Sequence, residues 1–129
     1  MVFILTLILN VTEVMASGAS YVAMNADVPN KFSYYSSSSR HKENIEKQLL
    51  EVSDTNRRLE AAIYNSDGTK ISPSWKSFDG PTLVWFSNSL EQAASASGET
   101  MRIRIRSTNY ILGGHIWAFW LPDPSAYGY

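Results

Sequence analysis

The chain has 129 residues, with 11 Lys or Arg against 12 Asp or Glu and no cysteine. This length fits a single domain, and a net charge near −1 provides no long-range field to attract nucleic acid, so no nucleic acid partner is expected. The absence of cysteine excludes disulfides, thiol nucleophiles and thiolate metal sites.

Residues 1–24 are predicted to form an apolar N-terminal arm, in which Glu13 is the only charged side chain. Its most apolar residues are Val2, Phe3, Ile4, Leu5, Leu7, Ile8 and Leu9. Because this run is apolar on every face, we expect it to be buried in lipid or among copies of the chain, with Glu13 protonated or paired with a cation. A helix is favoured, and a buried strand is the alternative, since periodicity does not separate the two in a short apolar run.

A secretory signal is another interpretation of this segment, because Ser17 and Ala19 fit a small-residue cleavage site. The positively charged start that such signals carry is missing. Loss of residues 1–19 would leave a secreted domain, whereas retention would leave an arm for assembly or anchoring. We therefore expect an extracellular or cell-surface location.

Residues 25–44 are predicted to be a polar linker or the continuation of a helix. The segment Asp27-Val-Pro29-Asn30 and the serine run that follows it interrupt regular structure. Apolar residues then recur at helical spacing from His41 to Glu51, which favours a short amphipathic helix. A strand from Lys47 to Val52 is the alternative.

Residues 45–129 are predicted to form a small antiparallel β-sandwich. Apolar or alternating runs are separated by turn signals, and five or more such runs are typical of a sandwich. The predicted strands cover residues 58–64, 69–72, 82–86, 101–106 and 115–121, and the turns are at Asn65-Ser-Asp67-Gly68, Asp79-Gly80-Pro81 and Gly113-Gly114. The clearest alternation points Met101, Ile103 and Ile105 inward and three arginines outward.

Those arginines, Arg102, Arg104 and Arg106, are a candidate face for a ligand or partner, because each guanidinium can bind two oxygens of a phosphate, sulfate or acidic sugar. The alternative is a solvated face with ion pairs to residues such as Glu60. The tryptophans are a candidate stacking platform for sugar rings or else part of the core. They are Trp75, Trp85, Trp117 and Trp120.

The sequence offers no candidate for catalysis or for a metal site. His41 and His115 are the only histidines, and neither has a carboxylate at helical or strand spacing. Gly-x-Ser-x-Gly, phosphate-binding glycine loops and His-Glu-x-x-His are missing. We therefore expect no enzymatic activity, no cofactor and no metal.

The order of elements combines the apolar N-terminal segment with three short motifs. These are Ile45-Glu-Lys-Gln-Leu-Leu50, Leu59-Glu-Ala-Ala-Ile-Tyr-Asn65-Ser-Asp-Gly68, and Ser97-Gly98-Glu99-Thr100 before an alternating strand. This combination resembles the archaeal type IV pilin-like family of pilins, archaellins and archaellum stator subunits. The resemblance implies an immunoglobulin-like domain carried on a hydrophobic helix, and a role in assembly.

The expected protein is thus mainly β, a small antiparallel immunoglobulin-like β-sandwich preceded by an apolar, helical arm. Its expected function is that of a structural subunit of an extracellular filament or cell-surface assembly, which polymerises with copies of itself through the arm. Two alternatives remain open. One is a secreted carbohydrate- or surface-binding sandwich, and the other is an envelope domain anchored in the membrane by its arm without polymerising.

Overall fold

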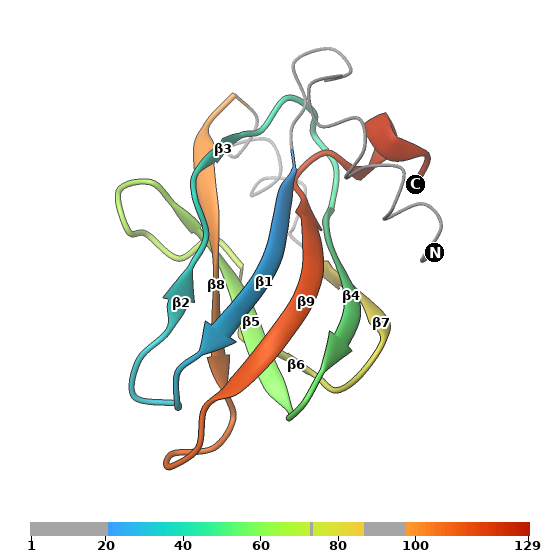
Figure 1. Cartoon of the computed structure of the whole chain (residues 1–129). Helices are drawn as coiled ribbons and strands as arrows, with labels where there is room; N and C mark the ends of the chain where they lie inside the picture. The colour runs from blue at the N-terminus through green and yellow to red at the C-terminus, as the bar shows by residue number, and fades with distance from the viewer. Residues whose placement is uncertain (1–20, 73, 87–97) are drawn as a thin grey trace.

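The computed structural model describes residues 21–72, 74–86 and 98–129, whose regular structure is almost entirely β-strand (Figure 1). The elements are β1 (Val22–Val28), β2 (Tyr35–Ser36), β3 (Arg40–His41), β4 (Gln48–Thr55), β5 (Leu59–Asn65), β6 (Lys76–Phe78), β7 (Thr82–Phe86), β8 (Thr100–Ser107), β9 (Gly114–Leu121) and the 3-10 helix η2 (Pro124–Tyr127).

The strands form two antiparallel sheets. Sheet I has the order β1-β9-β4-β7, and sheet II has the order β2-β8-β5-β6, with β3 pairing with another part of β8. In Figure 1, β1, β9 and β4 lie in front of β8 and β5, so the two sheets are separate layers. The prediction of a mainly β, antiparallel sandwich is therefore confirmed for the described residues.

The strand order is that of a jelly roll. If β2 and β3 are counted as two parts of one interrupted strand, the first strand pairs with the last, the second with the seventh, the third with the sixth and the fourth with the fifth. This is one long antiparallel hairpin wrapped into two sheets. An immunoglobulin sandwich instead places its first two strands side by side in one sheet. The described strands therefore do not follow the immunoglobulin-like order that the pilin-like resemblance implies.

The sandwich includes three strands from the predicted arm and linker, because β2 and β3 lie within residues 25–44 and pair with β8, and β1 spans the boundary between arm and linker. Strand β1 pairs along its whole length with β9, and Val22, Met24 and Val28 point into the core. Residues 22–28 thus belong to sheet I, although residues 1–24 were assigned to the arm and 25–44 to a linker. Pro29 follows directly, and its missing N–H suits the end of a strand.

The remainder of the predicted arm, residues 1–20, lies outside the described residues. It contains Val2, Phe3, Ile4, Leu5, Leu7, Ile8, Leu9 and Glu13. The predicted helix, its strand alternative and the role of Glu13 therefore stay predictions. Within the described part of the chain, no helix has the length and apolarity needed to cross a bilayer.

The helix predicted from His41 to Glu51 is wrong, and the alternative of a strand from Lys47 to Val52 is confirmed by β4. Leu50 faces the core between the sheets, whereas the adjacent Leu49 is buried on the other face of sheet I. A strand that is covered on both faces carries apolar residues without strict alternation, and this imitates helical spacing.

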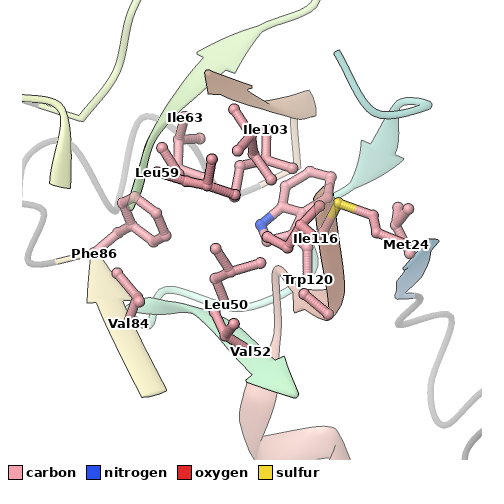
Figure 2. Close-up of a cluster of buried hydrophobic side chains, with 14 of the residues drawn as sticks. Met24, Leu50, Val52, Leu59, Ile63, Val84, Phe86, Ile103, Ile116 and Trp120 are labelled. Carbon is pink, nitrogen blue, oxygen red and sulfur yellow. The ribbon is translucent and has the colours of Figure 1, made fainter. Parts of the chain in front are cut away.

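Both sheets contribute to one apolar core (Figure 2). Trp120 is fully buried at its centre, which confirms the core alternative for this tryptophan, and its Nε1–H donates to Gln48 Oε1 at 2.9 Å. The labelled residues of Figure 2 show which strands meet there: Met24, Leu50, Val52, Val84, Phe86, Ile116 and Trp120 from sheet I, and Leu59, Ile63 and Ile103 from sheet II.

A second, smaller apolar cluster lies on the outer face of sheet I, where the C-terminal segment covers it. Its buried members are Tyr21, Leu49, Phe119 and Leu121, with Tyr127 and Tyr129 packed against them. Part of this outer face is therefore closed to ligands.

A buried ion pair connects the segment before β4 to the C-terminal segment. Lys42 Nζ donates to the carbonyl oxygen of Pro122 at 2.6 Å and lies 3.3 Å from Asp123 Oδ1, and both charged side chains are fully buried. Asp123 also accepts hydrogen bonds from the backbone N–H groups of Glu43 and Asn44. Burial lowers the pKa of Lys42, and the Asp123 carboxylate opposes that shift.

Candidate functional site

Strand β8 alternates as predicted. Its apolar residues are fully buried, and its arginines lie on the outer face of sheet II, where they are partly exposed. The buried set is Met101, Ile103 and Ile105, and the outer set is Arg102, Arg104 and Arg106. The structure therefore brings the three predicted arginines together on one face.

Aromatic rings cover two of these guanidinium groups. Arg104 Cζ lies 4.4 Å from the ring centre of Tyr34 and 4.1 Å from that of Tyr64. Arg106 Cζ lies 3.9 Å from the ring centre of Trp75. These contacts are cation–π stacks, and we call the three arginines with these three aromatic residues the arginine ladder.

The polar contacts of the ladder are uneven. Arg106 Nε donates to Glu60 Oε2 at 2.5 Å, which confirms an ion pair with the predicted residue. Arg102 Nη2 donates to Ser39 Oγ at 2.9 Å. In the part of the chain that the structure describes, Arg102 and Arg104 form no ion pair, and the buried Nε of each has no hydrogen-bond partner. The ladder is thus held largely by stacking.

A different group of side chains meets on the outer face of sheet I, where β1 and β9 pair. The register sets Asp27 opposite His115 and Asn25 opposite Trp117. His115 Nδ1 lies 2.8 Å from Asp27 Oδ1, and His115 Nε2 lies 2.6 Å from Asn25 Oδ1. The centres of the His115 and Trp117 rings are 4.3 Å apart. We call these four residues the tryptophan site.

The tryptophan site is open to solvent. Trp117 is 39% exposed, and the side chain of Asp27 is 97% exposed. Because Asp27 Oδ1 and Asn25 Oδ1 lie within hydrogen-bond distance of opposite ring nitrogens, the imidazole of His115 is oriented between them, beside Trp117. The site therefore offers one aromatic surface bordered by carboxylate, amide and imidazole groups.

The four tryptophans do not form one platform. Trp85, on β7, is 37% exposed on the same outer face as Trp117, but its ring packs against Tyr129 at 6.3 Å between centres. Trp75 belongs to the arginine ladder, and Trp120 is in the core. Trp117 stands beside polar side chains that a ligand can reach, and Trp85 borders a pocket whose lining includes Lys76, Ser77 and Asp79.

Between Trp117 and Trp85, the face of sheet I holds a buried carboxylate. Glu51 is almost completely buried, and the hydroxyl of Tyr129 donates to its Oε2. Burial raises the pKa of Glu51, and the hydrogen bond from Tyr129 opposes this. This pair helps to hold the C-terminal residue against the sheet.

The sequence missed the histidine–carboxylate pair because its members are 88 residues apart in the chain. No local spacing signals it, and only the register of β1 against β9 brings Asp27 to His115. The expectation that neither histidine has a carboxylate at strand spacing is wrong for His41, whose Nε2 lies 3.7 Å from Oε1 of Glu43, two residues along the chain. Among the described residues, His, Cys, Asp and Glu form no group of three or more that could hold a metal ion.

Comparisons with known proteins add no relative. Neither family models, nor curated proteins, nor solved structures gave a match to this chain.

Proposed function

We propose that this protein is a non-enzymatic carbohydrate-binding module of the cell exterior, which holds a sugar ring at the tryptophan site. The observation that carries the proposal is the exposed ring of Trp117, bordered by Asp27, Asn25 and His115. A sugar ring has an apolar face of C–H groups and an edge of hydroxyl groups. The indole ring suits the face, and the carboxylate and amide suit the edge.

Two further features support this proposal. Lectin domains are among the proteins built as jelly rolls, which is an analogy at the level of the fold. The first described core residue is Tyr21, so removal of residues 1–19 as a secretory signal would leave every described strand intact. The described strands would then remain together after secretion.

The test is binding of the full chain to an array of neutral and acidic oligosaccharides, followed by calorimetry with the shortest ligand found. Trp117→Ala should weaken binding by roughly tenfold or more, since an aromatic contact is worth about 0.5–1.5 kcal/mol beyond the apolar area that it buries. Asp27→Ala should weaken it by loss of hydrogen bonds. Wild-type affinity in Trp117→Ala, or no binding on the array, would refute the proposal.

Trp85→Ala is the matched control. Trp85 has almost the same exposure on the same face, but the register places it four residues along and two strands across from Trp117. This separates the two backbone positions by about 17 Å, which is beyond the reach of a disaccharide. Binding of a short ligand should therefore survive in Trp85→Ala.

A second candidate is the pilin-like structural subunit, which assembles with copies of itself through the apolar run between Val2 and Leu9. Its support is that sequence, which would be a liability if exposed on a soluble monomer. Light scattering in detergent-free buffer tests it, with a chain lacking residues 1–20 as the control. Residues 21–24 must stay, because Tyr21, Val22 and Met24 are buried in the sandwich. A monomeric full chain would contradict assembly, and vesicle binding that is lost from the chain lacking residues 1–20, without self-association, would favour membrane anchoring by the arm.

A further inference from the structure

The loops at one end of the sandwich expose large apolar side chains. Phe32, in the connection between β1 and β2, is 79% exposed, and Ile111, in the connection between β8 and β9, is 84% exposed. Tyr110 and Leu112 are about half exposed beside them. Figure 1 shows both connections at the end of the sandwich opposite the C-terminus, with the β8–β9 connection projecting beyond the sheets. We call these four residues the apolar tip.

The tip is a built structure in which hydrogen bonds join the two loops. Asn109 Oδ1 accepts from the backbone N–H groups of Ile111 at 2.7 Å and Leu112 at 2.9 Å. The carbonyl oxygen of Asn109 accepts from Lys31 N at 2.9 Å, and the rings of Phe32 and Tyr110 are 5.0 Å apart. The apolar side chains are therefore held outward by the backbone rather than left to collapse onto the sandwich.

Basic residues adjoin the tip. Lys31 Nζ lies 5.2 Å from the ring centre of Tyr110. Arg58, in the connection between β4 and β5, is tied to the base of the β8–β9 connection because its carbonyl oxygen accepts from Thr108 Oγ1. Arg57 beside it is exposed. Cations next to exposed apolar and aromatic side chains match the two layers of a bilayer surface, the acyl boundary and the anionic headgroups.

We propose that the apolar tip is a membrane-docking element, which inserts Phe32 and Ile111 into the interfacial region of a lipid bilayer containing anionic lipid. A projecting tip with aliphatic, Phe and Tyr side chains fits this occupant, because Tyr and aromatic rings favour the headgroup level and the aliphatic side chain enters the acyl boundary. This function is separate from sugar binding at the tryptophan site and from any role of residues 1–20.

The chain contains no cysteine, so single cysteines can report which part of it meets the membrane. Ile111→Cys is labelled with an environment-sensitive fluorophore and mixed with vesicles of phosphatidylcholine containing phosphatidylserine. The label should show a blue shift and higher emission, and these should decrease with salt. Leu83→Cys is the control, since Leu83 is 41% exposed on the outer face of sheet I. Its label should not respond.

The matching loss-of-function variant is the full chain with Phe32→Ser and Ile111→Ser together. Loss of two large apolar groups should weaken vesicle partitioning by at least about tenfold, with Leu83→Ser at the wild-type value. The proposal is overturned if the label at position 111 does not respond while the protein sediments with vesicles, because residues 1–20 or another face would then be responsible. It is also overturned if the emission of the label changes with protein concentration alone, in the absence of vesicles, and not with added vesicles. Absence of any vesicle binding would overturn it as well.

Discussion

Removing one member of the buried pair Lys42–Asp123 should have very different effects depending on which member is removed. Without its carboxylate, Asp123→Ala leaves Lys42 Nζ with the Pro122 carbonyl as its remaining hydrogen-bond acceptor. The backbone N–H groups of Glu43 and Asn44 also lose their acceptor. A buried charge deprived of its partner costs about 3–5 kcal/mol, which is a large part of the roughly 5–15 kcal/mol that stabilises a domain.

The opposite variant, Lys42→Met, should be mild. It removes the buried cation and fills similar volume with an apolar chain, while Asp123 keeps its two backbone donors. We expect a loss of about 1–2 kcal/mol. The double variant should then be more stable than Asp123→Ala alone, because it no longer contains an unpaired buried ammonium group.

Urea denaturation followed by tryptophan fluorescence gives the free energy of unfolding of the wild-type protein, the two single variants and the double variant. The pH dependence gives a second check on Asp123→Ala. Because burial lowers the pKa of Lys42, the folded state loses this proton at a lower pH than the unfolded state. The free energy of unfolding therefore rises with pH until the ordinary lysine pKa of about 10.4 is reached. The reasoning fails if Lys42→Met costs as much as Asp123→Ala, or if the double variant is no more stable than Asp123→Ala.

Two further predictions concern the outer faces of the sheets. Changing Arg102, Arg104 and Arg106 together to Lys should lower the free energy of unfolding by about 1–2 kcal/mol, because Lys keeps the charge but loses planar stacking; an unchanged urea midpoint would show that the ladder is only a solvated face. Burial raises the pKa of Glu51 above its usual 4.5 despite the opposing hydrogen bond from Tyr129. Its protonated form is therefore favoured by folding, and stability falls as pH rises from about 4.5 through the folded value. Glu51→Gln should flatten this fall in thermal melts between about pH 4 and pH 8, and equal slopes in the two proteins would contradict the assignment.

The local alternation of apolar and polar residues predicted those strands that bury one face and expose the other to solvent. Strand β8 is the clearest case, because Met101, Ile103 and Ile105 alternate with arginines that reach solvent. The turn after β5 also formed as expected, with Gly68 N donating to Asn65 O at 3.1 Å. Gly68 has φ +92°, a left-handed conformation that favours glycine. The returning strand predicted at residues 69–72 is reduced to one bridge, between Tyr64 and Lys70.

Strands covered on both faces were harder to recognise. Leu49 and Leu50 are adjacent and both fully buried, one on each side of sheet I. Such a pair interrupts the alternation of apolar and polar residues that indicates a strand, so the sequence of β4 favoured a helix. Strand β1 does alternate, but its apolar residues continue an apolar segment from residue 1 and were joined to it. The error came from extending one pattern across a boundary that only the pairing with β9 defines.

The sites were the least accessible to sequence reasoning, because each is assembled from distant segments. The arginines of the ladder were identified from β8 alone, but their stacking partners Tyr34, Tyr64 and Trp75 come from other parts of sheet II and its connections. The tryptophan site depends on the register between β1 and β9, which are the first and last of the described strands. Sequence reasoning can supply the chemical groups of such sites, but strand order decides which groups meet.

The topology also links the two proposed binding elements. Strand β1 carries Asn25 and Asp27 and leads to Phe32, while the connection carrying Ile111 leads into β9 and Trp117. Trp117 is three residues from the start of β9 at Gly114, or about 10 Å along the strand. A tip inserted in a bilayer would therefore hold the tryptophan site close to the headgroups, where the sugars of glycolipids lie. Because both contacts would belong to one rigid body, each would raise the effective concentration for the other, so a glycolipid carrying the bound sugar should increase vesicle affinity more than the free sugar affinity alone accounts for.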